Sequence, residues 1–410
     1  MLGTAGAVRR RAAHSVVVTL PALLALGCMT DFFVGPSDTE SGGTPPPEFP
    51  KVAVSPMSAT LSAVGATLTL SGVYYDSTGA PVSGLRMTWT SLNPGVATVS
   101  STNGHMTAIA SGQGTIAGEA DTLTGYALVT VSAPQASPYV DWQPVASPDP
   151  DELRGVWGLS ANDVYAVGKG GTVLHQGGTG WTSLATTVKE NLNAAWGSSS
   201  GDVYVVGDGG RLLHYGGAGW TATKLGSSHL HGVWGTSPIE VFVVGDGGRI
   251  RRFERGAWVL MASGATKNLR AVWGTSSNDV YAVGDGGIVR HFDGTAWLGI
   301  ATGTTKTLRA VWGSSPTDVF VAGDGGVVLH FNGAEWTPMP TPVSDGINGL
   351  WGTAGTEVYA ITANGRVLRY NGTDWTVAAN LGGGLRGIWG AYGARAYAVG
   401  NGGVIVRGSP

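Results

Sequence analysis

Four arginines recur at one position of a repeated segment, where they could bind anions. Each copy of the segment opens with an apolar residue, and the residue after it is Arg154, Asn193, His231, Arg270, Arg309, Asn348 or Arg386. A guanidinium group presents a planar fork of N–H donors that matches a carboxylate in two parallel hydrogen bonds. This series therefore predicts a site for an anionic or polyhydroxyl ligand, such as a surface glycan.

A second polar series lies on the adjoining turns and consists of Lys169, Asp208, Asp246, Asp285, Asp324, Ala363 and Asn401. Arginines and aspartates so placed can neutralise each other, and exposed pairs contribute little free energy. Mutual pairing on a solvated surface is therefore the alternative to ligand binding. Our candidate ligand-binding residues are Arg154, His231, Arg270, Arg309, Arg386, Asp208, Asp246, Asp285 and Asp324.

Two further polar series are weaker candidates for a binding or metal site. Six copies carry an acid six residues after their first tryptophan, at Asp163, Asp202, Glu240, Asp279, Asp318 and Glu357. Four copies carry a later histidine, at His175, His214, His291 and His330. Bonding to the turn backbone would account for the acids, which lack the neighbouring oxygen ligands that calcium needs. One histidine per copy does not converge on zinc, so we expect exposed or stacked rings.

Catalysis and nucleic-acid binding find no support. The sequence holds no nucleophile elbow, phosphate loop or zinc-hydrolase motif, so we expect no catalytic residue, cofactor or metal. The formal net charge of −3 gives no reason to expect nucleic acid as a partner.

A Trp-Gly pair marks the repeat that carries these residues. Its tryptophans are Trp157, Trp196, Trp234, Trp273, Trp312, Trp351 and Trp389, spaced 38 or 39 residues apart. The fourth copy divides into short strand candidates at 269–273, 280–283, 288–292 and 297–301, separated by turns such as Asp285-Gly286-Gly287. Asp-Gly turns predict antiparallel hairpins, and four short strands make one propeller blade. Residues 140–410 are thus predicted to form a seven-bladed β-propeller.

A second tryptophan starts the fourth strand of copies one to six, at Trp181, Trp220, Trp258, Trp297, Trp336 and Trp375. Copy seven ends before its own, but Trp142 precedes Trp157 by the same 15 residues that separate Trp181 from Trp196. The strand near Trp142 is therefore predicted to complete the last blade, which removes exposed sheet edges. We assign these fourteen tryptophans to the core rather than to a ligand cage. The pattern WG…DVYAVGDGG…HFDG…W resembles bacterial secreted and surface β-propeller repeats, a likeness that implies the fold and not the ligand.

Residues 51–133 contain β-rich runs between turn signals, a pattern typical of a β-sandwich. The pieces VAVSP, LTLSGVYYDSTG, TWTSLNPGVATVS and NGHMTAIASGQGTI resemble the group 2 bacterial immunoglobulin-like (Ig-like) domain. That resemblance implies a spacer role, with Trp89 as the core aromatic. The predicted fold class is accordingly all-β, a seven-bladed propeller preceded by an Ig-like sandwich.

The N-terminus reads as an export signal, since Arg9, Arg10 and Arg11 precede an apolar run from Ser15 to Leu26. Residues 24–28, LALGC, resemble the lipobox of bacterial lipoproteins, which implies that residues 1–28 are a signal peptide and Cys28 is lipidated. An ordinary cleaved signal with an incidental cysteine is the alternative. Residues 29–50 are rich in Pro, Gly and Ser and are predicted to be a tether.

Together these features predict an exported, monomeric, non-enzymatic lipoprotein at the outer membrane or cell surface. Its lipid anchor would bind the membrane, and its propeller would bind a protein or glycan in adhesion or envelope assembly. A propeller-based glycan hydrolase or lyase, or a structural spacer without a ligand, are the alternatives. Any one-sided site should lie where repetition fails, namely in copy three with its added arginines, in copy six at Ala363, or in copy seven at Arg395.

Overall fold

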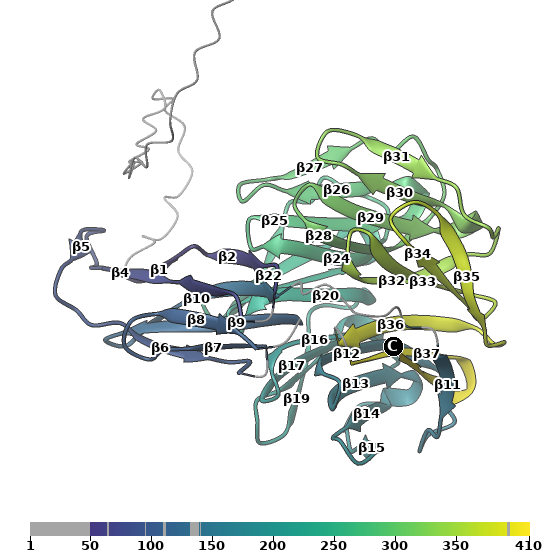
Figure 1. Ribbon diagram of the computed structural model, residues 1–410, viewed down its shortest axis with the longest axis horizontal. Helices are drawn as coiled ribbons and strands as arrows, with labels where there is room; N and C mark the ends of the chain where they lie inside the picture. Colours follow the sequence, from purple (N-terminus) through teal and green to yellow (C-terminus); the bar gives the residue numbers. More distant parts are fainter. Residues whose placement is uncertain are drawn as a thin grey trace, which may run out of the picture. The chain divides into compact units, whose positions relative to one another are not determined.

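The computed structural model describes residues 50–63, 65–94, 96–109, 112–131, 139, 141–391 and 394–410 (Figure 1). The predicted signal peptide, Cys28 and all of the predicted tether except Pro50 lie outside the described residues. Within these ranges the structure is β-strand with single turns of 3₁₀ helix, and no helix is both long and apolar enough to span a membrane.

The N-terminal described residues form three small sheets around one core. The sheets are β1 (Lys51–Ser55), β4 (Ser71–Tyr75) and β5 (Pro81–Val82); β2 (Ser58–Leu61), β10 (Leu123–Val131), β9 (Gly112–Ala120) and β6 (Thr88–Ser91); and β3 (Thr67–Thr69), β8 (His105–Ala108) and β7 (Ala97–Val99). Alternate residues of these strands point inward, so Val52, Val54, Ile116 and Val129 pack on Trp89. Trp89 is 4% exposed, as expected for the core aromatic.

Seven four-stranded antiparallel sheets, here called blades, make up the rest of the structure (Figure 1). Blades one to three are β12 (Leu153–Ser160), β13 (Asp163–Gly168), β14 (Val173–Gln176) and β15 (Trp181–Leu184); β16 (Leu192–Ser199), β17 (Asp202–Gly207), β18 (Arg211–Tyr215) and β19 (Trp220–Lys224); and β20 (Leu230–Ser237), β21 (Glu240–Gly245), β22 (Ile250–Glu254) and β23 (Ala257–Met261).

Blades four to six are β24 (Leu269–Ser276), β25 (Asp279–Gly284), β26 (Val289–Phe292) and β27 (Trp297–Ile300); β28 (Leu308–Ser315), β29 (Asp318–Gly323), β30 (Val328–Phe331) and β31 (Trp336–Met339); and β32 (Ile347–Ala354), β33 (Glu357–Thr362), β34 (Arg366–Tyr370) and β35 (Trp375–Asn380). Blade seven contains β36 (Leu385–Ala391), β37 (Arg395–Gly400) and β38 (Ile405–Ser409). The second strand of each blade is buried on both faces because neighbouring blades cover it, which explains its apolar sequence, such as DVYAVG in β25.

The fourth strand of blade seven comes from the start of the repeat array. β11 (Asp141–Val145) pairs antiparallel with β38, and Trp142 lies opposite Gly408. Tyr139 adds two hydrogen bonds to the C-terminal blades: its hydroxyl donates to the carbonyl of Ala391 at 2.6 Å, and its amide donates to the hydroxyl oxygen of Tyr359 at 2.8 Å. One sheet thus joins the two ends of the array and leaves no open seam in the ring.

Each Trp-Gly pair joins two blades. The indole of one blade lies against the glycine of the next, so that a Cβ on Gly313 would lie 2.6 Å from Cη2 of Trp273. The same contact pairs Trp157 with Gly197, Trp196 with Gly235, Trp234 with Gly274, Trp312 with Gly352, Trp351 with Gly390 and Trp389 with Gly158. The last contact closes the ring. Glycine is needed here because there is no room for a Cβ, not because of its backbone conformation.

We predict that Gly313→Ala lowers the free energy of unfolding by about 1–3 kcal/mol, the usual cost of overpacking a well-packed core. The added methyl would meet both the Trp273 ring and the carbonyl oxygen of Asp318, at 2.7 Å. Chemical denaturation of the two proteins measures the difference. Gly219→Ala is the matched control, because a Cβ there meets nothing within 4 Å. Equal stability of the two variants would contradict the interlocking role of the pair.

Candidate functional site

The first strand of each blade, here called the inner strand, is β12, β16, β20, β24, β28, β32 or β36. These strands carry the first polar series to one mouth of the central channel. Each residue of this series is the second residue of its inner strand, at the end where that strand begins. Arg154, Asn193, His231, Arg270, Arg309, Asn348 and Arg386 together with Asp208 line one cavity of about 360 Å³. We call this the arginine mouth. The structure therefore brings together all five arginine and histidine residues that the sequence singled out.

Three blades pair the candidate residues with each other. Arg270 donates to both carboxylate oxygens of Asp285, from Nε at 2.8 Å and from Nη2 at 2.9 Å. In blade five, Nε of Arg309 donates to Asp324 at 2.6 Å, and in blade three Nε2 of His231 lies 2.7 Å from Oδ1 of Asp246. The pairing expected as the alternative to ligand binding is thus present in blades three to five.

This pairing changes the protonation chemistry of the acids. The hydrogen bond from Arg270 lowers the pKa of Asp285, and the same bond raises the pKa of Arg270. At Asp208, burial raises the pKa, but hydrogen bonds from Asn193 and Asn191 outweigh it, and the net pKa is lowered. Both carboxylates are therefore charged at neutral pH.

The other blades depart from this scheme. Arg154 donates to Glu152 at 2.7 Å and to Asn193 at 2.9 Å. Arg386 donates to Asn401 at 2.8 Å, and its Nη2 lies 3.2 Å from Glu152, which two arginines therefore share. In blade six the turn residue is Ala363, and Asn348 keeps only the bond to the next blade, to the carbonyl of Leu385 at 2.7 Å, which Asn193 also makes to Leu230 in blade two. The mouth is a symmetric ring with an asymmetric distribution of charge.

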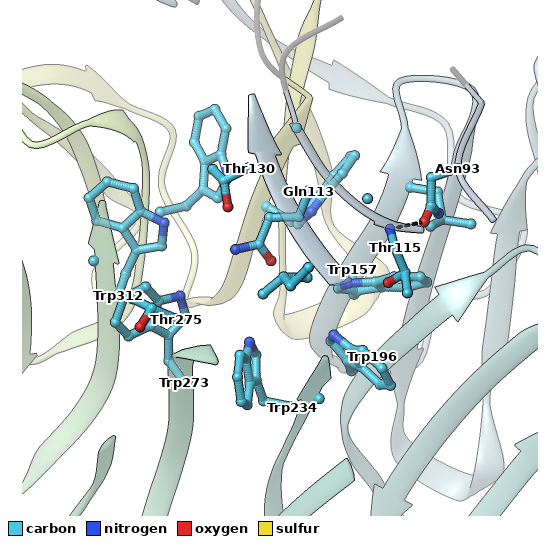
Figure 2. Close-up of a pocket in the computed structure, with 18 of the residues that line it drawn as sticks. Asn93, Gln113, Thr115, Thr130, Trp157, Trp196, Trp234, Trp273, Thr275 and Trp312 are labelled. Carbon is cyan, nitrogen blue, oxygen red and sulfur yellow. Dashed lines mark hydrogen bonds between the residues drawn. The ribbon is translucent and has the colours of Figure 1, made fainter. Parts of the chain in front are cut away.

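The Trp-Gly tryptophans, which we assigned to the core alone, also surround a cavity at the other end of the inner strands. All seven line a space of about 310 Å³. Figure 2 shows five of them, Trp157, Trp196, Trp234, Trp273 and Trp312, arranged around it. The signal for this cavity was present in the sequence, because one residue repeated at the same place on every inner strand must form a ring.

Polar residues of the N-terminal sheets also line this tryptophan cavity. Gln113 points into it in Figure 2, and Thr115 lies at its edge with its amide donating to Oδ1 of Asn93 at 2.7 Å. The hydroxyl of Thr115 donates to the carbonyl of Thr236 in β20 at 3.1 Å. The tryptophan cavity is therefore lined both by the inner strands and by the N-terminal sheets.

Residues 48–131 match the family model of the bacterial Ig-like domain (group 2). The curated proteins include no match to this chain. Among solved structures, YCF48 bound to D1 peptide is 17% identical, with a TM-score of 0.57 over 67% of this chain and 99% of that one. The WD40 β-propeller domain of Doa1 is 10% identical, with a TM-score of 0.56 over 66% of this chain and 98% of that one. Streptogramin B lyase is 12% identical, with a TM-score of 0.58 over 66% of this chain and 99% of that one.

The chain carries a group 2 bacterial Ig-like domain followed by a β-propeller. The predicted all-β fold class is thereby confirmed. At these identities the solved structures show the fold alone, and they transfer no ligand or reaction to the propeller.

The acids after the first tryptophan link the second strand to the third in blades one to six. In blade four, Oδ1 of Asp279 lies 2.6 Å from Nε2 of His291, and its other oxygen accepts from Thr275. The His291 ring stacks on Tyr281 with centroids 4.3 Å apart. Blades one, two and five repeat the acid–histidine contact, with His175, His214 and His330. The interpretation of these acids as turn-backbone acceptors is wrong, because the third strand places a histidine within hydrogen-bond distance of them.

Blades three and six make the same link with different residues. Arg252 donates to Glu240 at 2.9 Å, and Arg369 donates to both oxygens of Glu357, at 2.8 and 2.7 Å. A longer acid thus accompanies an arginine in place of the histidine. In the described ranges, no group of three or more His, Cys, Asp or Glu side chains is placed to hold a metal ion.

We predict that Asp285 stabilises the propeller above pH 4 and loses this effect in acid. Its pKa is lowered in the folded state, so its contribution is complete above the ordinary aspartate pKa of about 3.9 and is lost as pH falls through the folded pKa. The measurement is the free energy of unfolding of the wild type minus that of Asp285→Asn, from pH 6 to pH 2.5. In an Arg270→Gln background the pH dependence of this difference should become smaller, because Arg270 is the largest of the groups that lower the pKa of Asp285. An unchanged pH dependence there would contradict the role of Arg270.

Proposed function

We propose that this protein is a non-enzymatic lipoprotein of the cell envelope whose propeller is a binding platform for an acidic protein or glycan. The observation that carries the proposal is the arginine mouth, where Arg154, Arg270, Arg309 and Arg386 line one cavity of about 360 Å³. Four guanidinium groups around one space attract anions, and arginine binds carboxylates with directional pairs of hydrogen bonds.

A ligand of this kind suits a ring of repeated strands. The residues of the mouth lie on inner strands that the Trp-Gly contacts hold in place, so the donors are positioned before the ligand arrives. YCF48, a protein of similar fold, has been solved with a bound peptide. That likeness supports a peptide as one class of ligand, by analogy of fold.

The envelope location rests on the sequence. The LALGC pattern before Cys28, the Pro-rich residues 29–50 and the Ig-like domain would place the propeller away from a membrane in series. Met29 stands where an aspartate would favour the inner membrane, which favours the outer membrane or the cell surface. The Ig-like domain would act as the spacer.

We predict that the triple variant Arg270→Ala, Arg309→Ala, Arg386→Ala loses at least tenfold in affinity for acidic ligands, since each charged hydrogen bond is worth about 1.5–3 kcal/mol. Ligands are found by applying the purified full chain in detergent to arrays of acidic peptides and acidic glycans. Asp374→Asn, on an exposed turn, is the surface-charge control. Unchanged binding by the triple variant would exclude the arginine mouth as the site. Turnover of an arrayed glycan would favour a hydrolase or lyase, and the absence of any ligand would favour a spacer.

We predict that Cys28→Ser moves the protein from the membrane to the soluble fraction of a bacterial host, because one thiol is the only site for the lipid. Fractionation and the intact mass of the mature chain measure the change. Met29→Ser is the neighbouring control and should leave the protein in the membrane. Membrane retention of Cys28→Ser would refute the lipid anchor.

A further inference from the structure

The arginine mouth is open at blades six and seven because side chains are missing there. The residue before the inner strand has a polar side chain in blades one to five, at Glu152, Asn191, His229, Asn268 and Thr307. It is Gly346 in blade six and Gly384 in blade seven, and Ala363 replaces the turn aspartate of blades two to five. A cavity of about 340 Å³ occupies this sector, and its lining includes Arg309 with its partner Asp324, Asn348, Ala363, Arg386 and Asn401.

Two arginines on either side of this cavity keep free donors. Arg309 uses only Nε, which donates to Asp324 at 2.6 Å. Arg386 uses Nε toward Asn401 and Nη2 toward Glu152. Among the described residues, both terminal nitrogens of Arg309 and Nη1 of Arg386 have no protein partner. The two side chains are 42% and 43% exposed, so a ligand can reach them.

Arg270 in blade four provides the contrast. Its Nε and Nη2 both donate to Asp285, so a carboxylate of its own blade neutralises it, whereas Nε of Arg386 donates to the neutral amide of Asn401. Blades six and seven have Ala363 and Asn401 at that turn position and therefore no turn acid to fill a fork. Asp324 is the one acid among the residues that line the cavity between Arg309 and Arg386, so two guanidinium groups and one carboxylate face this space.

The lining of this cavity favours a peptide over a sugar. None of its residues is aromatic, so a sugar ring has no flat apolar face on which to stack. Asn348 lines the cavity, and its amide nitrogen donates to Leu385, which leaves its carbonyl oxygen as an acceptor for a peptide N–H. The arginines supply donors for carboxylates on the same ligand.

We propose that the open sector between Arg309 and Arg386 is a carboxylate site that binds an acidic peptide segment. This proposal rests on the proposed function and narrows the arginine mouth to one sector. One carboxylate accepts hydrogen bonds from the free nitrogens of Arg309 and a second from Arg386, over the space that Ala363 leaves open.

The test measures fluorescence anisotropy of a fluorescein-labelled hexaglutamate peptide with the purified full chain in detergent. Arg309→Gln and Arg386→Gln should each weaken binding about tenfold or more, because each removes charged hydrogen bonds. Ala363→Asp should do the same, since it restores the turn aspartate of blades two to five beside the site. That variant tests the site without deleting a contact, and its thermal unfolding should match the wild type.

Arg255→Gln, on the exposed turn between β22 and β23 and outside the mouth, is the surface-charge control and should change the affinity less than about twofold. Arg270→Gln should weaken binding less than Arg309→Gln does, because Asp285 already neutralises this guanidinium. Arg386→Lys keeps the charge and loses the fork, so its affinity should fall between wild type and Arg386→Gln. Hexaglutamine should not bind. This graded set would support the carboxylate site even if Ala363→Asp failed to fold.

Other outcomes separate this proposal from the proposed function. An Arg270→Gln loss equal to that of Arg309→Gln would overturn the one-sector site and leave the mouth as the platform. Binding of hexagalacturonate but not of hexaglutamate, lost in the same variants, would overturn the peptide and leave a glycan platform. Binding of hexaglutamate that survives replacement of Arg270, Arg309 and Arg386 together would overturn both.

Discussion

The contact of each indole with the glycine of the next blade is the constraint on which the propeller depends. The ring carbons of Trp273 occupy the space that a Cβ on Gly313 would need, and six equivalent contacts complete the circle. A tryptophan can bury roughly 150–250 Å², so each contact is also a large apolar interface. Because Trp389 covers Gly158, the last blade is held against the first, and β11 then completes the sheet of blade seven.

The two ends of the inner strands lie at two different mouths of the closed propeller. The second residue of every inner strand lies at the arginine mouth, and the tryptophan lies toward the other. A repeated position on a ring becomes a ring of side chains, so symmetry alone provides arginines and indoles in circles. Recognition of one ligand needs a departure from that symmetry, and Gly346, Ala363 and Gly384 provide it in adjacent blades.

Comparison of the seven copies also shows which departures from the common repeat are accompanied by a second substitution that restores the lost contact. Blade three differs from its neighbours by several arginines, which marked it in the sequence as a candidate site. The structure pairs Arg252 with Glu240, as blade six pairs Arg369 with Glu357, so this change replaces one structural link by another. In blade six, Ala363 cannot accept a hydrogen bond from Asn348 as Asp208 does from Asn193 in blade two, and Asn348 keeps only its bond to a backbone carbonyl. The uncompensated departure is the one that leaves a cavity.

The sequence by itself determined the repeat, the four strands of each blade, the Ig-like domain and the convergence of the arginine series, because period, turn residues and alternation are local signals. The position of Trp142 also predicted the strand that β11 forms. The tertiary structure alone decided which arginines are already paired, that the tryptophans surround a cavity, and that the repeated acids bind histidines. These are contacts between strands or blades, and their geometry depends on how the closed ring packs side chains that lie far apart along the chain.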